Sequence, residues 1–151
     1  MKYGGFWIRS VSWFIDGIIV SIFFAIVHKL FDLSLGVHLQ FLKGGTVDQV
    51  KNFYGSPDVM FLSILSIGIS WIYMAGFMSS KWQATPGMRL LSLKVVDYTG
   101  ERISFGRATV RYLASWVSGS LFMLGYIMVA FTPRKQSLHD YIAETLVLRE
   151  E

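Results

Sequence analysis

Two long apolar stretches, separated by polar sequence, dominate the pattern of this chain. The first runs from Phe6 to Val27 and the second from Val59 to Met78, and the second carries no charged residue. Each stretch makes about 30 Å of helix at roughly 1.5 Å per residue, which matches the hydrocarbon core of a bilayer. We therefore expect two transmembrane helices.

The first apolar stretch carries one polar face. Arg9, Ser12 and Asp16 follow each other at steps of three and four residues, so they lie on one face of a helix. An ionised carboxylate at mid-membrane depth costs roughly 2.5–3.5 kcal/mol, so Asp16 should face protein or trapped water. Two interpretations stay open: a lock that holds the helix against a neighbour, and a site that binds a proton or a cation.

The second apolar stretch has a face of small and hydroxylated residues, formed by Ser63, Ser66, Ser70 and Tyr73. Such a face can approach another helix closely or donate hydrogen bonds to it. We expect it to be the partner of the Asp16 face. The alternative is that the serines serve only as small packing residues.

A third apolar region spans residues 105–132 and carries a second polar face that includes Arg111. Arginine stays charged and can donate two hydrogen bonds to one carboxylate, so Arg111 is the preferred partner for Asp16. The region either crosses the membrane once or bends near residues 118–120 and returns. The positive-inside rule favours the bend, because it brings the basic tail to the same side as the other basic segments.

After the second apolar region, Thr85-Pro86-Gly87 has the pattern of a helix cap with proline at the first helical position. The polar segment 88–104 that follows has the pattern of a β-hairpin. Leu90–Asp97 reads as a strand, Gly100 as a turn residue with positive φ, and Glu101–Ser104 as a short return strand. Its open edge needs a partner, and Ile142–Arg149 has the pattern of a strand that can supply one.

Together these expectations describe an all-α membrane protein with a small cytoplasmic β-hairpin joined by a C-terminal strand. We expect a single domain over residues 1–151. Its parts, in order, are a transmembrane helix at 6–27, an outer loop at 28–58, a second transmembrane helix at 59–78, the hairpin at 88–104, the helical region at 105–132 and the tail at 133–151.

Composition narrows the class of protein. Hydrophobic residues make up 53% of the chain and charged residues 16%, which is typical of an integral membrane protein. The net charge of +4 comes from basic residues that flank apolar segments, so positive-inside bias explains it better than nucleic-acid binding. The chain has no Cys, which excludes disulfides and thiolate metal sites. We expect no metal, no cofactor and no enzymatic activity.

The tail contains one further acidic candidate, Asp140, next to His139. Two adjacent residues cannot both face one metal ion from a helix, so a metal site is not expected here. Asp140 can instead pair with Arg9 or Arg111 at the inner interface. That pair would tie the tail to the first helix.

Three motifs in sequence order, GFWIRSVSWFID, TPGMRLLSLKVVDYTGERISFGRATVR and TPRKQSLHDYIAETLVL, resemble the RDD family of bacterial membrane proteins. The family is named for one arginine and two aspartates, and the resemblance places these at Arg9, Asp16 and Asp140. Two positions differ from its pattern: Met88 stands where lysine is usual, and Glu144 where glycine is common. A role for that lysine therefore does not carry over.

The resemblance implies a multi-pass protein of the bacterial cytoplasmic membrane. The positive-inside rule places the N-terminus in the cytoplasm and, with the bend, the C-terminus as well. The resemblance also implies two functions. In the first, Asp16 exchanges protons and monovalent cations, with Arg9, Ser12, Arg111 and Asp140 as further binding candidates. In the alternative, the protein is a non-enzymatic accessory module. Its partners would then be the lipid bilayer and either a second copy or another membrane protein.

Overall fold

The computed structural model describes residues 2–30, 57–120 and 124–150, and these are mostly helical. The expected outer loop at 28–58 lies almost wholly outside the described residues. The contacts of the chain divide it into two compact units. The first comprises Met1–Gly17 and Trp71–Glu151, and the second comprises Ile18–Ser70.

The two expected membrane helices are confirmed. Helix α1 covers Phe6–Leu30 and helix α4 covers Pro57–Ser79. The parts long and apolar enough to span a bilayer are Phe6–Val27 and Met60–Ser79. They coincide with the sequence prediction to within one residue at each end.

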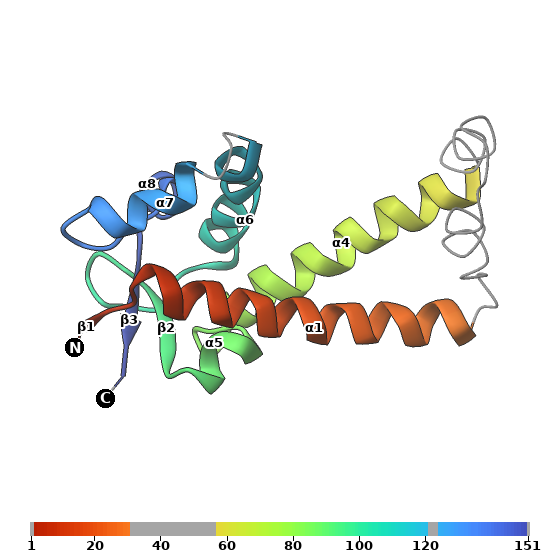
Figure 1. The fold of residues 1–151 in the computed structure, drawn as a ribbon, viewed down its shortest axis with the longest axis horizontal. Helices are drawn as coiled ribbons and strands as arrows, with labels where there is room; N and C mark the ends of the chain where they lie inside the picture. The colour runs from red at the N-terminus through yellow and green to blue at the C-terminus, as the bar shows by residue number, and fades with distance from the viewer. Residues whose placement is uncertain (1, 31–56, 121–123, 151) are drawn as a thin grey trace. The chain divides into compact units, whose positions relative to one another are not determined.

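A three-stranded antiparallel sheet lies in the first unit (Figure 1). Its strands are β1 at Lys2–Tyr3, β2 at Leu93–Asp97 and β3 at Thr145–Arg149, and β3 is the central strand. The C-terminal strand was predicted, and the short N-terminal strand was not. A two-residue strand has too little sequence for a period-two pattern to be visible.

The predicted hairpin is corrected by this sheet. Residues 101–104 form no strand, and β2 pairs along its whole length with β3. The carboxylate of Asp97 accepts hydrogen bonds from the backbone N–H groups of Thr99 and Glu101, both at 2.9 Å. These bonds close a tight turn in which Gly100 has the expected positive φ of 86°. The chain then leaves the sheet for the next helix instead of returning along β2.

The short helix α5, Pro86–Leu90, follows the second membrane helix and begins as the sequence predicts. Thr85 is its N-cap, and the Thr85 hydroxyl accepts a hydrogen bond from the N–H of Met88 at 3.3 Å. Proline stands at the first helical position, where its missing N–H is not needed. The core beside α5 is formed by apolar side chains, which include Ala75, Met78, Ala84, Met88, Leu93, Val95, Ile103, Ala108 and Val147.

The third apolar region forms helix α6, Phe105–Ser120, and helix α7, Leu124–Phe131. The two axes are bent by 94°, which fits a broken span or a re-entrant loop. Residues 121–123, between the two helices, lie outside the described residues. A further short helix, α8 at Leu138–Ile142, precedes β3.

Candidate functional site

Asp16 is held by three hydrogen-bond donors from other parts of the first unit. The Tyr73 hydroxyl donates to Oδ1 at 2.8 Å, and the Thr85 hydroxyl donates to Oδ2 at 2.5 Å. The backbone N–H of Gly87 donates to Oδ1 at 2.8 Å. The side chain retains 2% of its exposure, so these bonds replace its hydration. Hydrogen bonds to charged groups are worth about 1.5–3 kcal/mol each, which makes this carboxylate a strong anchor.

The start of α5 makes this contact possible. As the N-cap, Thr85 places its hydroxyl between the N–H of Met88 and the carboxylate of Asp16. A Cβ atom on Gly87 would lie 2.3 Å from the carbonyl oxygen of Ser12 and 2.8 Å from Cγ of Asp16. Only glycine permits this approach, since the nearest atom belongs to the backbone of α1.

The expected pair between Asp16 and Arg111 is wrong. In the described residues the donors on Asp16 are uncharged, and Arg111 forms its ion pair with Asp140. The prediction matched an acid to a base by charge alone. The structure instead brings the first turn of α5 to the carboxylate, and a backbone N–H with two hydroxyls satisfies it without a cation.

A second cluster surrounds Asp140, whose side chain is fully buried. Arg9 donates from Nη1 to Oδ2 at 2.5 Å, and Arg111 donates from Nη1 to Oδ1. The backbone N–H of Ser137 adds a third bond, to Oδ2 at 2.9 Å. Arg111 also donates to the hydroxyl of Thr145, at 2.6 Å. The predicted pairing of Asp140 with Arg9 or Arg111 is confirmed, and both arginines take part.

The remaining donors of Arg9 bind backbone oxygens. Its Nε donates to the carbonyl of Gly4 at 2.7 Å, and Nη2 donates to the carbonyl of Lys135 at 2.5 Å. Arg9 thus joins three segments that are far apart in sequence: the turn before α1, the turn after α7 and helix α8. The tail is tied to the first helix as expected.

The charges of this cluster set the protonation of Asp140 and His139. Burial by itself raises the pKa of the Asp140 carboxyl, but the positive charges of Arg111 and Arg9 outweigh it and hold the pKa below its usual value. Burial, followed by the charge of Arg111, lowers the pKa of His139 to about 3. At neutral pH the cluster therefore contains an ionised Asp140 and an uncharged His139.

His139 completes the packing between α6, α7 and α8. Its Nε2 lies 2.8 Å from the Ser137 hydroxyl, and its Nδ1 lies 3.3 Å from the Ser118 hydroxyl. The ring packs against Tyr126, with centroids 5.0 Å apart. A Cβ atom on Gly125 would lie 2.7 Å from Cβ of Ser118, so α7 also approaches α6 closely.

The other predicted site residues have local roles. Ser12 is buried, and its hydroxyl donates to the carbonyl of Arg9 at 2.8 Å, which is a bond within its own helix. Ser66 donates to the carbonyl of Ser63 at 2.9 Å, which is also a bond within one helix. Of the predicted helix-packing face, Tyr73 is the residue whose side chain binds Asp16.

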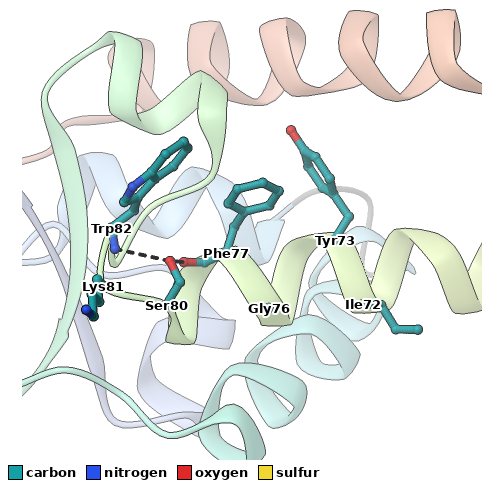
Figure 2. Close-up of a pocket in the computed structure, with 7 residues that line it drawn as sticks. All are labelled: Ile72, Tyr73, Gly76, Phe77, Ser80, Lys81 and Trp82. Atoms are coloured by element: carbon teal, nitrogen blue, oxygen red, sulfur yellow. Dashed lines mark hydrogen bonds between the residues drawn. The ribbon is translucent and has the colours of Figure 1, made fainter.

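Two cavities lie beside these clusters. The smaller, with a volume of about 440 Å³, is formed by the end of α4 and the turn after it (Figure 2). Figure 2 shows Tyr73 pointing away from its own helix towards α1, and Phe77 and Trp82 directed to the same side. The Phe77 and Trp82 rings lie 5.5 Å apart. The larger cavity lies between the start of α1 and the end of α7.

Sequence reasoning did not identify Thr85 and Gly87 as ligands of Asp16. The motif Thr-Pro-Gly was visible and was interpreted only as a helix cap. The first turn of a helix also has backbone N–H groups without a partner inside the helix, and these can donate hydrogen bonds to a carboxylate. In the described residues no group of three His, Cys, Asp or Glu side chains is arranged to hold a metal ion.

Comparison with known proteins finds relatives that match nearly the whole chain. The chain is 37% identical over 151 residues to "Uncharacterized protein YxaI" of Bacillus subtilis (strain 168), which covers 97% of each chain. It is 28% identical over 153 residues to "Uncharacterized membrane protein YteJ" of the same organism, covering 99% of this chain and 82% of that protein. No solved structure matches the chain.

The sequence pattern of the RDD family matches residues 3–144, a range that contains both carboxylates, the donors that bind them and every helix described above. Arg9, Asp16 and Asp140, to which the resemblance assigns the arginine and the two aspartates of the family name, all lie within this range. The chain is a membrane protein that belongs to the RDD family.

Proposed function

We propose that this protein is a non-enzymatic accessory module that binds another membrane protein, and that its buried charges are structural. The observation that carries the proposal is the complete internal binding of both acidic groups. Asp16 accepts three hydrogen bonds from the chain itself. Asp140 accepts one bond from each of two arginines and one from the backbone.

An exchange site must release its bound groups in each cycle. Freeing Asp16 would break three hydrogen bonds to a charged group, which costs several kcal/mol in a buried site at about 1.5–3 kcal/mol each. Opening would also move α5 away from α1, because Gly87 and Ser12 are in close contact. The geometry therefore favours a lock over a carrier.

Helix α6 offers a surface for a partner. Its buried face is small and polar, whereas Val110, Leu113, Trp116 and Val117 are exposed. An apolar helix face of this kind can pack on a helix of another membrane protein or of a second copy through van der Waals contact. Trp116 would be the largest side chain in that interface.

The topology that we propose places both termini in the cytoplasm, with α6 and α7 forming a re-entrant pair. Strand β2 precedes α6, strand β3 follows α7, and the two strands pair over five residues. This pairing supports a return of the chain to the side from which it entered. The positive-inside rule favours the cytoplasmic side, because the same side carries Arg134, Lys135 and Arg149.

Exchange of protons and monovalent cations is the second candidate, and one observation favours it. The hydroxyl oxygens of Tyr73 and Thr85 lie within hydrogen-bond distance of the carboxylate of Asp16. Oxygen atoms gathered in this way at membrane depth could replace water around a cation if the donors turned away. This candidate requires an open conformation that differs from the one described here.

The deciding experiment is proton movement in proteoliposomes that carry an imposed pH gradient. Pulses of sodium, potassium and lithium are applied to the natural protein, to Asp16→Asn and to the surface control Glu101→Gln, whose side chain is exposed. We expect no cation-triggered change beyond that of protein-free liposomes in any of the three. A signal in the natural protein and in Glu101→Gln that disappears in Asp16→Asn would refute the proposal and establish exchange.

Binding of a partner is tested separately by a photo-crosslinking amino acid at position 116 in intact cells. The control carries it at position 14 of α1, which is also exposed. A discrete protein adduct at position 116, absent at position 14, is the expected result. Lipid adducts alone at both positions would contradict the proposed role of α6.

A further inference from the structure

The larger cavity joins an apolar wall to a basic rim. Its volume is about 1090 Å³, slightly above the range of roughly 300–1,000 Å³ that is usual for small-molecule sites. The wall comes from the first turn of α1 and the last turns of α7 and includes Phe6, Trp7, Ile127 and Phe131. Trp7 and Phe131 are 80% and 83% exposed, so the wall is open to its surroundings.

The rim is formed by Lys2, Lys135 and Arg149. Lys2 and Arg149 stand opposite each other in the pairing of β1 with β3. None of the residues that line the cavity, all of which the structure describes, is acidic.

The backbone around Lys135 directs that side chain to the cavity. Lys135 has a positive φ of 48°, which is strained for a residue with a side chain. Its carbonyl is fixed by the bond from Arg9 at 2.5 Å. Its Nζ atom lies 3.6 Å from the place that a Cβ on Gly5 would occupy. The buried charge cluster therefore holds one part of the basic rim in position.

We propose that this cavity binds an anionic phospholipid, with the phosphate at the basic rim and an acyl chain along the apolar wall. The cavity lies where the membrane span of α1 begins, so the rim is at headgroup level and the wall extends towards the hydrocarbon core. A free phosphate would use the rim alone and leave the aromatic wall uncovered. The combination of charge and apolar surface therefore selects a lipid as the occupant.

The test uses the full chain in detergent and native mass spectrometry with phosphatidylglycerol and phosphatidylcholine of identical acyl chains. Each basic group near an anionic headgroup contributes about fivefold in affinity. We expect at least a roughly tenfold preference for phosphatidylglycerol, because the rim carries more than one basic group. Lys135→Gln should reduce phosphatidylglycerol binding about fivefold. The matched control, Arg102→Gln, removes an exposed charge elsewhere and should leave it unchanged.

Inorganic phosphate, added as a competitor, separates the two sources of the anion. It should fail to displace phosphatidylglycerol, since it cannot use the apolar wall. Equal binding of the two lipids, an equal effect of Lys135→Gln and Arg102→Gln, or displacement by inorganic phosphate would each overturn the proposal. Lys135 and Arg102 are exposed, so neither variant is expected to disturb folding.

Discussion

Replacing Arg111 and Asp140, singly and together, should show a clear interaction free energy between these two residues. The same experiment on Arg111 and Asp16 should show almost none. Asp140 is fully buried between Arg9 and Arg111. Asp140→Ala leaves both guanidinium groups without their carboxylate, and breaking a buried pair in this way costs about 3–5 kcal/mol. Arg111→Met should cost less, because Asp140 keeps its bond to Arg9.

The double variant measures the interaction directly. Once Asp140 is absent, replacing Arg111 removes an unpaired buried charge, so the two effects should not add. We expect the double variant to be less unstable than the sum of the single variants by about 0.5–3 kcal/mol. The matching cycle with Asp16→Ala and Arg111→Met should be additive to within roughly 0.5 kcal/mol, since the two residues share no partner.

The assay is equilibrium unfolding in mixed micelles at pH 7.5, where Asp140 is ionised because its pKa lies below its usual value. Both cycles are measured under identical conditions, and each uses the same Arg111→Met protein. Additivity in the cycle with Asp140, or strong coupling in the cycle with Asp16, would refute the assignment of partners described here.

Two further predictions concern packing and pH. Gly87→Ala should destabilise the protein by about 1–3 kcal/mol in the same unfolding assay, because its Cβ would lie 2.3 Å from the backbone oxygen of Ser12. The control Gly119→Ala, whose Cβ would meet no atom within 4 Å, should be neutral or stabilising. His139 is uncharged when folded but takes up a proton when unfolded, so stability should fall as pH drops from about 6.5 towards 3, by about 2 kcal/mol at pH 5. His139→Gln should remove most of that dependence, and an unchanged pH profile would contradict the buried, uncharged histidine.

Sequence patterns were sufficient for the parts of the fold that depend on local physics. The length of an apolar run gave both membrane helices to within one residue, and the cap at Thr85 and the turn at Gly100 followed from residue chemistry. Glu144 is a related case. It has a φ of 52°, a left-handed conformation that explains why glycine suits this position in the family pattern.

Contacts between residues that are far apart in sequence could be predicted only in part. With two acidic and two basic candidates near the membrane, charge alone could not decide which pairs form. Asp140 was matched correctly, whereas Asp16 was matched to Arg111 instead of to Thr85 and Gly87. The correct partners include a backbone N–H, and the residue types in a sequence do not indicate the direction in which a backbone N–H points. The same limit applies to β1, whose pairing depends on the tail.

The most direct test of the structural lock is the reactivity of Asp16 towards a hydrophobic carbodiimide in proteoliposomes, read by mass spectrometry. A carboxylate that is 2% exposed and bound by three donors should stay unmodified. Removing two donors in Tyr73→Phe with Thr85→Val should make it reactive. The account predicts this contrast, with no effect of added sodium or lithium. Modification of Asp16 in the natural protein, suppressed by either cation, would contradict it and indicate a cation-binding site.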